Sequence, residues 1–94
     1  WTVGTSGHTT DDFTINYDAA YKMLFRLYDN SAVTVYGDLS LDRANGDAGQ
    51  DCELNQYSTS HVTIYDDLIL KNTKSTKLMK YTLTDNAILT VKDD

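Results

Sequence analysis

The chain has 94 residues, of which 40% are hydrophobic and 23% are charged, and its formal net charge is −6 at pH 7. This length allows one hydrophobic core, and the acidity argues against a nucleic-acid partner because binding to phosphates depends on clusters of lysine and arginine. The sequence holds no window of 18 consecutive apolar residues that could span a membrane, and its single cysteine excludes an intramolecular disulfide.

Strand patterns begin near the N-terminus. Thr2-Val3 predicts the start of a first strand, and apolar residues then alternate with polar ones over residues 13–17, as in a strand with one buried face. Residues 18–29 fit two patterns. A helix would gather Ala20, Tyr21, Leu24, Leu27 and Tyr28 on one stripe, whereas a strand would place Tyr21, Met23, Phe25 and Leu27 on one face.

Residues 23–38 and 79–94 are two copies of one pattern, 56 positions apart without a gap. In each copy, apolar residues alternate on both sides of an Asp-Asn pair. Asp and Asn tolerate positive φ, so the pattern predicts two antiparallel hairpins. The second copy is rich in strand formers, which favours a strand in the first copy too. We therefore expect residues 21–28 to pair antiparallel with residues 32–38.

The middle of the chain continues with short apolar runs. Residues 32–42 keep one apolar parity and predict one long strand, in which Gly37 marks a bend. Residues 43–51 predict a long loop, and residues 71–76 predict another. Between these loops lie further strand patterns, around residues 52–57, 62–64 and 68–70.

Together these elements predict a single β domain over residues 1–94. The expected fold class is all-β, a small antiparallel meander barrel or curled sheet of roughly seven to nine short strands. An open β-sandwich is the second interpretation, and an α+β fold with a helix over residues 18–29 is the third. The predicted core consists of Phe13, Ile15, Met23, Phe25, Leu27, Val33, Val35, Leu39, Leu41, Leu54, Val62, Ile64, Met79, Tyr81, Leu83, Leu89 and Val91.

The segment 42–53 is the most electronegative short stretch of the chain. Its oxygen donors, Asp42, Asn45, Asp47, Asp51 and Glu53, surround two glycines, and calcium prefers such hard oxygens. The glycines do not fall in the register of an EF-hand loop, however, and Arg43 adds a positive charge. The sequence therefore predicts a solvated acidic loop rather than a metal site.

Residues able to carry catalysis are few. His8, His61 and Cys52 are far apart in the sequence, and no zinc-binding, nucleophile-elbow or phosphate-binding motif occurs. Cys52 shares parity with Leu54, so it is expected to be a small buried side chain. These observations predict that the protein is not an enzyme and has no catalytic residues, metal site or cofactor.

Four of the seven tyrosines are expected to point outward: Tyr28, Tyr36, Tyr57 and Tyr65. Exposed tyrosine combines apolar area with a hydroxyl group and is enriched in protein interfaces. The alternative is that these side chains only pair with each other across neighbouring strands. A run of lysines over residues 71–80 has two interpretations as well, protection of a sheet edge or a docking patch for an acidic partner.

The stretch Phe25–Gly37 resembles the early hairpin of small bacterial lipocalin-like domains, and Tyr81–Val91 resembles their closing hairpin. Trp1 fits their opening strand. This resemblance implies a small meander barrel, often on an envelope lipoprotein, that acts as a ligand binder or a hydrolase inhibitor. It supplies no functional residue.

The leading hypothesis is a non-enzymatic secreted or cell-envelope β domain that binds a protein partner through its exposed tyrosines or loops, for example as a hydrolase inhibitor or toxin-like effector. The alternative is a carrier of a small apolar ligand, which would need an internal cavity of roughly 300 Å³ or more.

Overall fold

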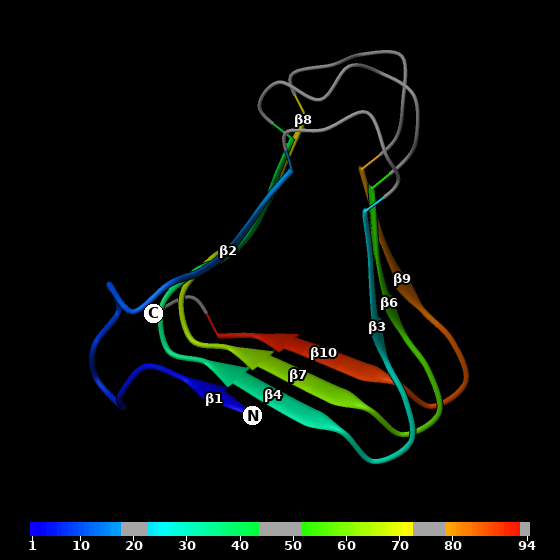
Figure 1. Cartoon of the computed structure of the whole chain (residues 1–94). Coiled ribbons are helices and arrows are strands. Elements are labelled where there is room, and N and C mark those ends of the chain that lie inside the picture. The colour runs from blue at the N-terminus through cyan, green and yellow to red at the C-terminus, as the bar shows by residue number, and fades with distance from the viewer. Residues whose placement is uncertain (18–22, 44–51, 73–78, 93–94) are drawn as a thin grey trace.

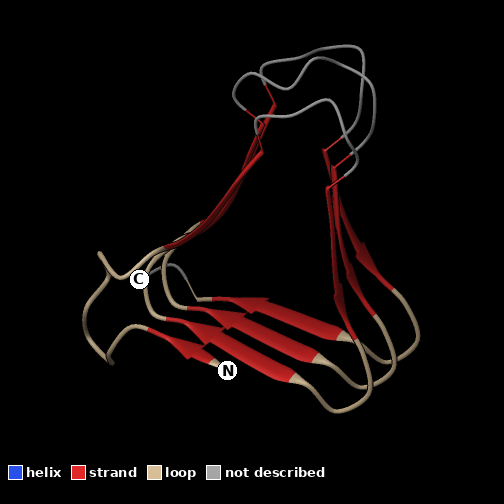
Figure 2. Ribbon diagram, in the orientation of Figure 1, coloured by secondary structure: helices blue, strands red, loops and turns tan. Residues whose placement is uncertain are grey.

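The computed structural model describes residues 1–17, 23–43, 52–72 and 79–92, and at Asn16, Tyr17, Met23, Arg43, Cys52 and Asn72 it describes the backbone alone. All regular structure in these ranges is strand (Figure 2). The strands are β1 (Thr2–Val3), β2 (Phe13–Tyr17), β3 (Met23–Leu27), β4 (Ala32–Val35), β5 (Leu39–Arg43), β6 (Cys52–Gln56), β7 (His61–Ile64), β8 (Leu68–Asn72), β9 (Met79–Leu83) and β10 (Ile88–Val91).

The strands form three sheets that face one another as the sides of a triangle (Figure 1). Sheet A has the order β1-β4-β7-β10, sheet B has β2-β5-β8, and sheet C has β3-β6-β9. The chain visits the three sheets in turn and then returns to the first, so each circuit is one coil stacked on the coil before it. This arrangement is a parallel β-helix, in which each coil contacts only its neighbours.

The all-β prediction is confirmed, but the antiparallel meander barrel is wrong. Every strand pairing in the described residues is parallel. The barrel implied by the lipocalin-like resemblance is therefore not found. Parallel and antiparallel strands share the same alternation of side chains, so the pattern of apolar residues could not distinguish them. The number of strands also exceeds the predicted range.

The 56-residue repeat is the length of two coils, not the distance between two hairpins. Val33 is in register with Val62, and Val62 is in register with Leu89, so the two coils are 29 and 27 residues long. Residues 21–28 do not pair with residues 32–38. Instead β3 pairs with β6, and β4 pairs with β1 and β7.

The predicted turns at the two Asp-Asn pairs are present, but each connects a strand of sheet C to a strand of sheet A instead of closing a hairpin. At this corner Asp29, Ser58 and Asp85 have φ of 57°, 58° and 63°. A turn hydrogen bond joins residues three apart, for example from the Ser31 amide to the Tyr28 carbonyl at 3.2 Å. Successive corners stack, since the Thr59 amide donates to the Asp29 carbonyl at 3.1 Å. The chain therefore bends into the next sheet instead of reversing.

The corner from sheet A to sheet B divides the single long strand predicted for residues 32–42. The chain bends at residues 36–38, which separate β4 from β5. Gly37 lies at this bend, as predicted, and a β-carbon there would be 2.3 Å from Asp12 Oδ1 and 2.7 Å from the Asp11 carbonyl carbon. The glycine is thus required by the close approach of residues 11–12.

The contested segment is a strand in its described part, since β3 covers Met23–Leu27 and residues 18–22 lie outside the described residues. The long loop predicted at residues 43–51 also lies almost wholly outside them. Among the described residues, no helix is long and apolar enough to cross a membrane.

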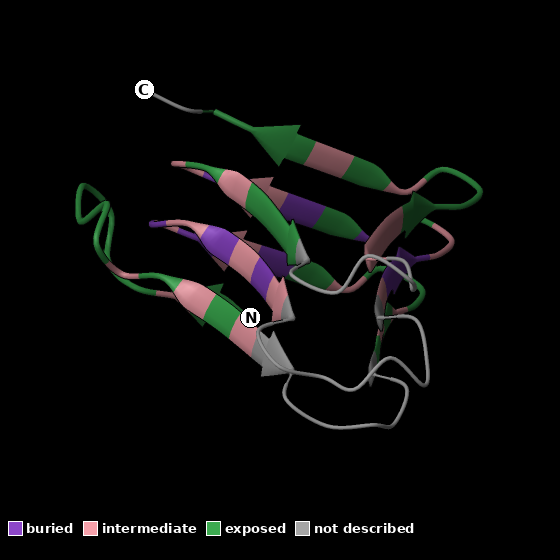
Figure 3. Ribbon diagram, turned by 90° about the horizontal axis from the view of Figure 1, so that it is seen from above, coloured by how far each residue is buried: buried purple, intermediate pink, exposed green. Residues whose placement is uncertain are grey.

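We call β5, β6 and β7 the middle coil and β8, β9 and β10 the last coil. The core lies between the three sheets and is centred on the middle coil (Figure 3). Its buried apolar residues are Val33, Val35, Leu39, Leu41, Leu54, Val62 and Ile64, all of which were predicted. Two predicted core residues, Leu83 and Val91, are instead exposed. The prediction also missed Gln56, a polar residue with no exposed area.

Candidate functional site

The structure brings the four predicted tyrosines together as two stacked pairs. The rings of Tyr28 and Tyr57 lie 4.9 Å apart with an interplanar angle of 9°. Those of Tyr36 and Tyr65 lie 4.8 Å apart at 28°. Each pair joins equivalent positions of neighbouring coils. The rings of each pair therefore contact one another across neighbouring coils.

The two tyrosine stacks border the same two strands. Tyr28 and Tyr57 precede the turns that lead into β4 and β7, while Tyr36 and Tyr65 directly follow these strands. Tyr28 is half exposed and the other three are partly buried. The Lys92 ammonium lies 4.7 Å from the centre of the Tyr65 ring, which extends the second stack by one coil. The stacks therefore frame sheet A from both ends of its strands.

The outward face of sheet A is a column of threonines beside a mixed column. In β4 and β7, valine and isoleucine point inward and are buried, so the alternate residues point outward. Thr34 is in register with Thr2 on one side and Thr63 on the other, and Thr63 is in register with Thr90. The second column consists of Ala32, His61 and Ile88.

This face differs in charge from the other two. When histidine is counted as neutral, none of the outward residues described for sheet A carries a formal charge. Sheet B carries Asp42 and Lys71 on its outward face, and sheet C carries Arg26, Glu53 and Lys80. Depletion of charged residues and enrichment of tyrosine are both typical of the centre of a protein interface.

The three carboxylates of Asp38, Asp66 and Asp67 form an acidic cluster at the corner between sheets A and B. One oxygen from each lies within 4.8 Å of the others. The cluster has a structural use, because Asp38 Oδ1 accepts a hydrogen bond from the Asp67 amide at 2.9 Å. Asp12 Oδ1 accepts in the same way from the Asp38 amide at 2.7 Å. A ladder of aspartates thus satisfies the backbone amides of the stacked corners.

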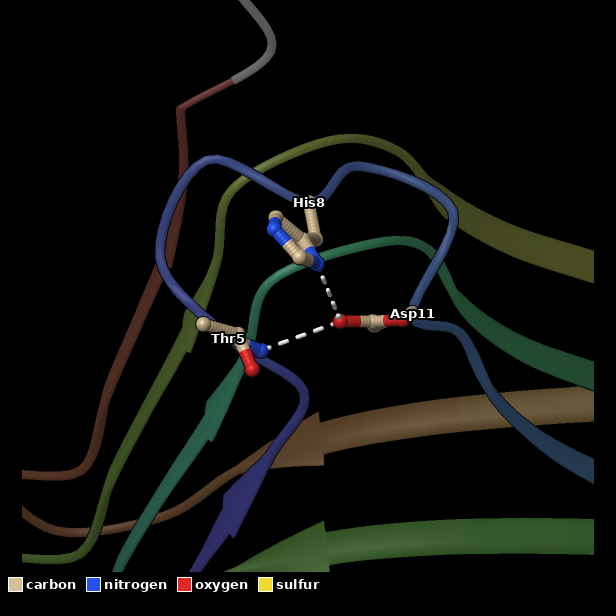
Figure 4. Close-up of polar contacts among 3 residues, drawn as sticks. All are labelled: Thr5, His8 and Asp11. Carbon is tan, nitrogen blue, oxygen red and sulfur yellow. Dashed lines mark hydrogen bonds and ion pairs between the residues drawn. The ribbon is translucent and has the colours of Figure 1, made fainter.

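The side chains of His8 and Asp11 lie close together in the loop between β1 and β2 (Figure 4). His8 Nδ1 lies 3.6 Å from Asp11 Oδ2, and the same oxygen accepts a hydrogen bond from the Thr5 amide at 3.0 Å. The His8 side chain is 64% exposed. Two backbone hydrogen bonds, from His8 to the Thr5 carbonyl and from Asp11 to the His8 carbonyl, hold the same loop together. The contact between His8 and Asp11 therefore helps to hold this loop closed.

The other residues considered for chemistry are dispersed. His61 lies on the outward face of sheet A, far along the chain from the His8 loop. Cys52 begins β6, and its side chain lies outside the described part of the structure. Of the acidic segment 42–53, residues 44–51 lie outside it too. At its end, Glu53 forms an ion pair with Lys80 at 3.2 Å.

The interior contains a buried polar group that the sequence did not indicate. Gln56 Nε2 donates to the carbonyls of Ser60 at 3.2 Å and Ile88 at 3.0 Å, and its Oε1 accepts from the Tyr81 hydroxyl. Burial raises the pKa of the Tyr81 hydroxyl well above its usual range, so the group stays a hydrogen-bond donor even at alkaline pH. This network fixes the middle coil to the last coil.

One apolar cavity lies between the sheets, lined by side chains of the described residues. This cavity has a volume of about 10 Å³, which is close to the minimum needed for a single water molecule. Its lining is apolar: Phe13, Ile15, Phe25, Leu27, Val33, Leu39, Leu54 and Val62.

Comparison of the chain with protein-family models, with curated proteins and with solved structures finds no match in any of the three.

Proposed function

We propose that the protein is a non-enzymatic binding module, secreted or held at the cell envelope, that contacts a protein partner with the outward face of sheet A and the tyrosine stacks beside it. The observation that carries the proposal is the absence of charged side chains from this face in the described residues, within a chain that is 23% charged. Burying such a face against a partner avoids the cost of desolvating charges.

The shape of the face supports the same function. Its threonine column comes from strands in continuous parallel register, so its side chains are held by the sheet and lose little conformational freedom on binding. The stacked tyrosines at the borders restrain one another in a similar way. A rigid surface of hydroxyl and aromatic groups is the composition found in many protein-binding surfaces.

In the experiment, the immobilised chain is exposed to the extracellular medium of its source, and the protein that it captures is identified. The affinity of the chain for that protein is then measured by titration. We expect Thr63→Glu to weaken binding at least about tenfold, because the carboxylate would be buried in the interface. The matched control is Thr82→Glu, an exposed threonine of β9 on the outward face of sheet C.

A second pair of variants tests the tyrosine borders. Tyr28→Ala removes the most exposed ring of the two stacks and is expected to weaken binding by a similar factor. If Thr63→Glu and Tyr28→Ala both bind the captured protein as tightly as the unchanged chain, while both remain folded, the proposal is wrong. Use as a hydrolase inhibitor would then require a different surface.

A further inference from the structure

The outer edge of β10 carries backbone groups without a partner strand. Within the described residues, sheet A ends at β10. The Ile88 amide donates to the Ser60 carbonyl at 3.0 Å, so the backbone groups of Ile88 point toward β7. Successive residues of a strand direct their amides and carbonyls to opposite sides. The amides and carbonyls of Leu89 and Val91 therefore lie on the outer edge, where a further strand could pair with them.

The side chains of the same two residues are apolar and incompletely covered. Leu89 and Val91 point toward the axis of the coil, as do Val62 and Ile64, with which they are in register. Val62 and Ile64 are buried because strands lie on both sides of β7. Val91, by contrast, is 41% exposed. A strand added to β10 would cover these apolar side chains and pair with the backbone at the same time.

The other two edge strands of the last coil are protected against such pairing, whereas β10 is not. Lys71 lies within β8 and Lys80 lies within β9, and both occupy outward positions. Lysine on an edge strand opposes pairing with another chain. The four residues of β10, Ile88–Val91, include no charged side chain. Of the three strands in the last coil, β10 is thus the one whose edge is open to a further strand.

The charge around this edge selects the kind of strand that can approach it. Residues 68–92 contain five lysines against one aspartate, although residues 1–67 contain eleven acidic and three basic residues. Lys92 directly follows β10, is exposed, and lies with its ammonium 4.7 Å from the centre of the Tyr65 ring. This basic surrounding attracts an acidic strand and repels the last coil of a second copy.

We propose that the outer edge of β10 binds an extended acidic segment of a partner protein, which adds to sheet A as a fifth strand. Apolar residues at alternate positions of the segment lie over Leu89 and Val91, and a carboxylate at an outward position lies beside Lys92. In this mode of recognition, backbone hydrogen bonds supply affinity and the alternate side chains supply specificity. The edge is a different surface from the outward face of sheet A, so the inference does not rest on the proposed function.

The test uses a synthetic peptide of alternating valine and glutamate with blocked ends, and a matched control with lysine in place of glutamate. At low salt, the glutamate peptide is expected to slow amide hydrogen exchange at Leu89 and Val91. It should leave Thr90 unchanged, because the Thr90 amide already faces β7. The lysine peptide is expected to bind at least about fivefold more weakly. Added salt should narrow this difference, since it screens the charges.

Three variants of the chain separate the edge from the outward face. Val91→Pro removes an amide donor of the edge and is expected to abolish binding, while proline is tolerated where its nitrogen lies on a free edge. Lys92→Glu is expected to reverse the preference between the two peptides. Thr63→Glu changes the outward face alone and should bind the glutamate peptide as the unchanged chain does. Failure of the edge and failure of the proposed function are therefore distinguished.

Far-UV circular dichroism confirms that each variant is folded, and Lys92→Glu decides the test if Val91→Pro is not. Unchanged exchange at Leu89 and Val91 with millimolar glutamate peptide would overturn the proposal. So would equal affinity for the two peptides at low salt, or full binding by folded Val91→Pro. Slowing of the same amides with rising concentration of the chain alone would assign the edge to a second copy and would overturn it as well.

Discussion

The middle coil and the last coil both carry mostly apolar residues at their inward positions, yet the inward residues of the last coil are less buried. Leu41 and Leu70 are the same residue type in register on adjacent strands, and their exposed fractions are 0% and 43%. The difference comes from stacking. A side chain of the middle coil is covered on both sides, whereas one of the last coil is covered on one side only. In a β-helix, the neighbouring coils decide burial more than hydrophobicity does.

Gln56 and Leu83 also show that the position in the stack decides burial, because here the polar residue is the buried one. The polar residue lies in the middle coil and is fully buried, while the apolar residue one coil later is 47% exposed. Gln56 can be buried because its amide has partners on both its nitrogen and its oxygen. One of these partners is Tyr81 of β9, so the last coil is also tied to the middle coil by a hydrogen bond.

The largest expected effect is the difference in stability lost when Leu41 and Leu70 are each replaced by alanine. Leu41→Ala should lower the free energy of unfolding by about 2–5 kcal/mol, because it leaves a cavity in a closely packed interior. Leu70→Ala should cost less than about 1.5 kcal/mol, since solvent already reaches that side chain. Urea denaturation of both variants measures the difference. An equal loss of unfolding free energy in the two variants would mean that Leu70 is buried in solution, and would contradict this account.

A second test compares a crowded glycine with an open one. Gly37→Val should cost about 1–3 kcal/mol because its β-carbon would collide with residues 11–12. Gly7→Ala is the control. Gly7 has φ of 85° but no atom near its β-carbon position, so its cost reflects backbone strain alone, about 1 kcal/mol. An unchanged denaturation midpoint for Gly37→Val would show that residues 11–12 do not approach this corner.

Tyr81→Phe tests the link between the last coil and the middle coil. It removes the hydroxyl that donates to Gln56 and should cost about 0.5–1.5 kcal/mol, because the Gln56 oxygen is left without this donor. Thermal unfolding provides the measurement. Tyr28→Phe serves as the comparison, since its ring remains stacked and its hydroxyl has no role in the core.

The same hydroxyl predicts a dependence of stability on alkaline pH. Burial raises the pKa of Tyr81 in the folded protein above the value of about 10 found in unfolded chains. The stabilisation is therefore complete below about pH 10 and is lost as the pH rises toward the folded-state pKa. Tyr81→Phe should flatten the fall in stability above about pH 10. An identical fall in the variant would contradict a buried, protonated hydroxyl.

The smallest expected effect concerns calcium and the acidic segment. We predict no change in melting temperature with millimolar calcium, although a ligand at a hundredfold excess over its Kd would add about 2.7 kcal/mol. Calorimetry with and without the ion is the measurement. A rise of more than a few degrees that Asp47→Ala abolishes would identify a calcium site there.

Much of the local structure could be predicted from the sequence, while the topology could not. The alternation of Val33, Val35, Val62 and Ile64 identified inward residues, because side chains alternate in any strand. It carried no information on which strands pair. The repeat at 56 residues was visible because both copies contain Asp-Asn, whereas the middle coil has Ser58-Thr59 at the same corner. The shorter spacing was still readable, since Tyr28 and Tyr36 recur as Tyr57 and Tyr65 after 29 residues.

The sequence pointed to the tyrosines of the candidate site, but it did not indicate their arrangement or the threonines between them. The four tyrosines were expected outside the core, but only the register of the coils places them in pairs beside one sheet. The threonine column was invisible for the same reason, because Thr2, Thr34, Thr63 and Thr90 become neighbours only when coils stack. Gln56 was missed because a polar residue enters a core only with partners supplied by distant segments.

The register between β4 and β7 is tested most directly by nuclear Overhauser effects between backbone protons of the 94-residue chain. The parallel β-helix predicts contacts that place Thr34 opposite Thr63, with the Tyr65 amide near the Val35 carbonyl. Contacts that join residues 21–28 to residues 32–38 in antiparallel order would contradict it, and the tyrosine stacks and the threonine column would be lost with the coils that align them.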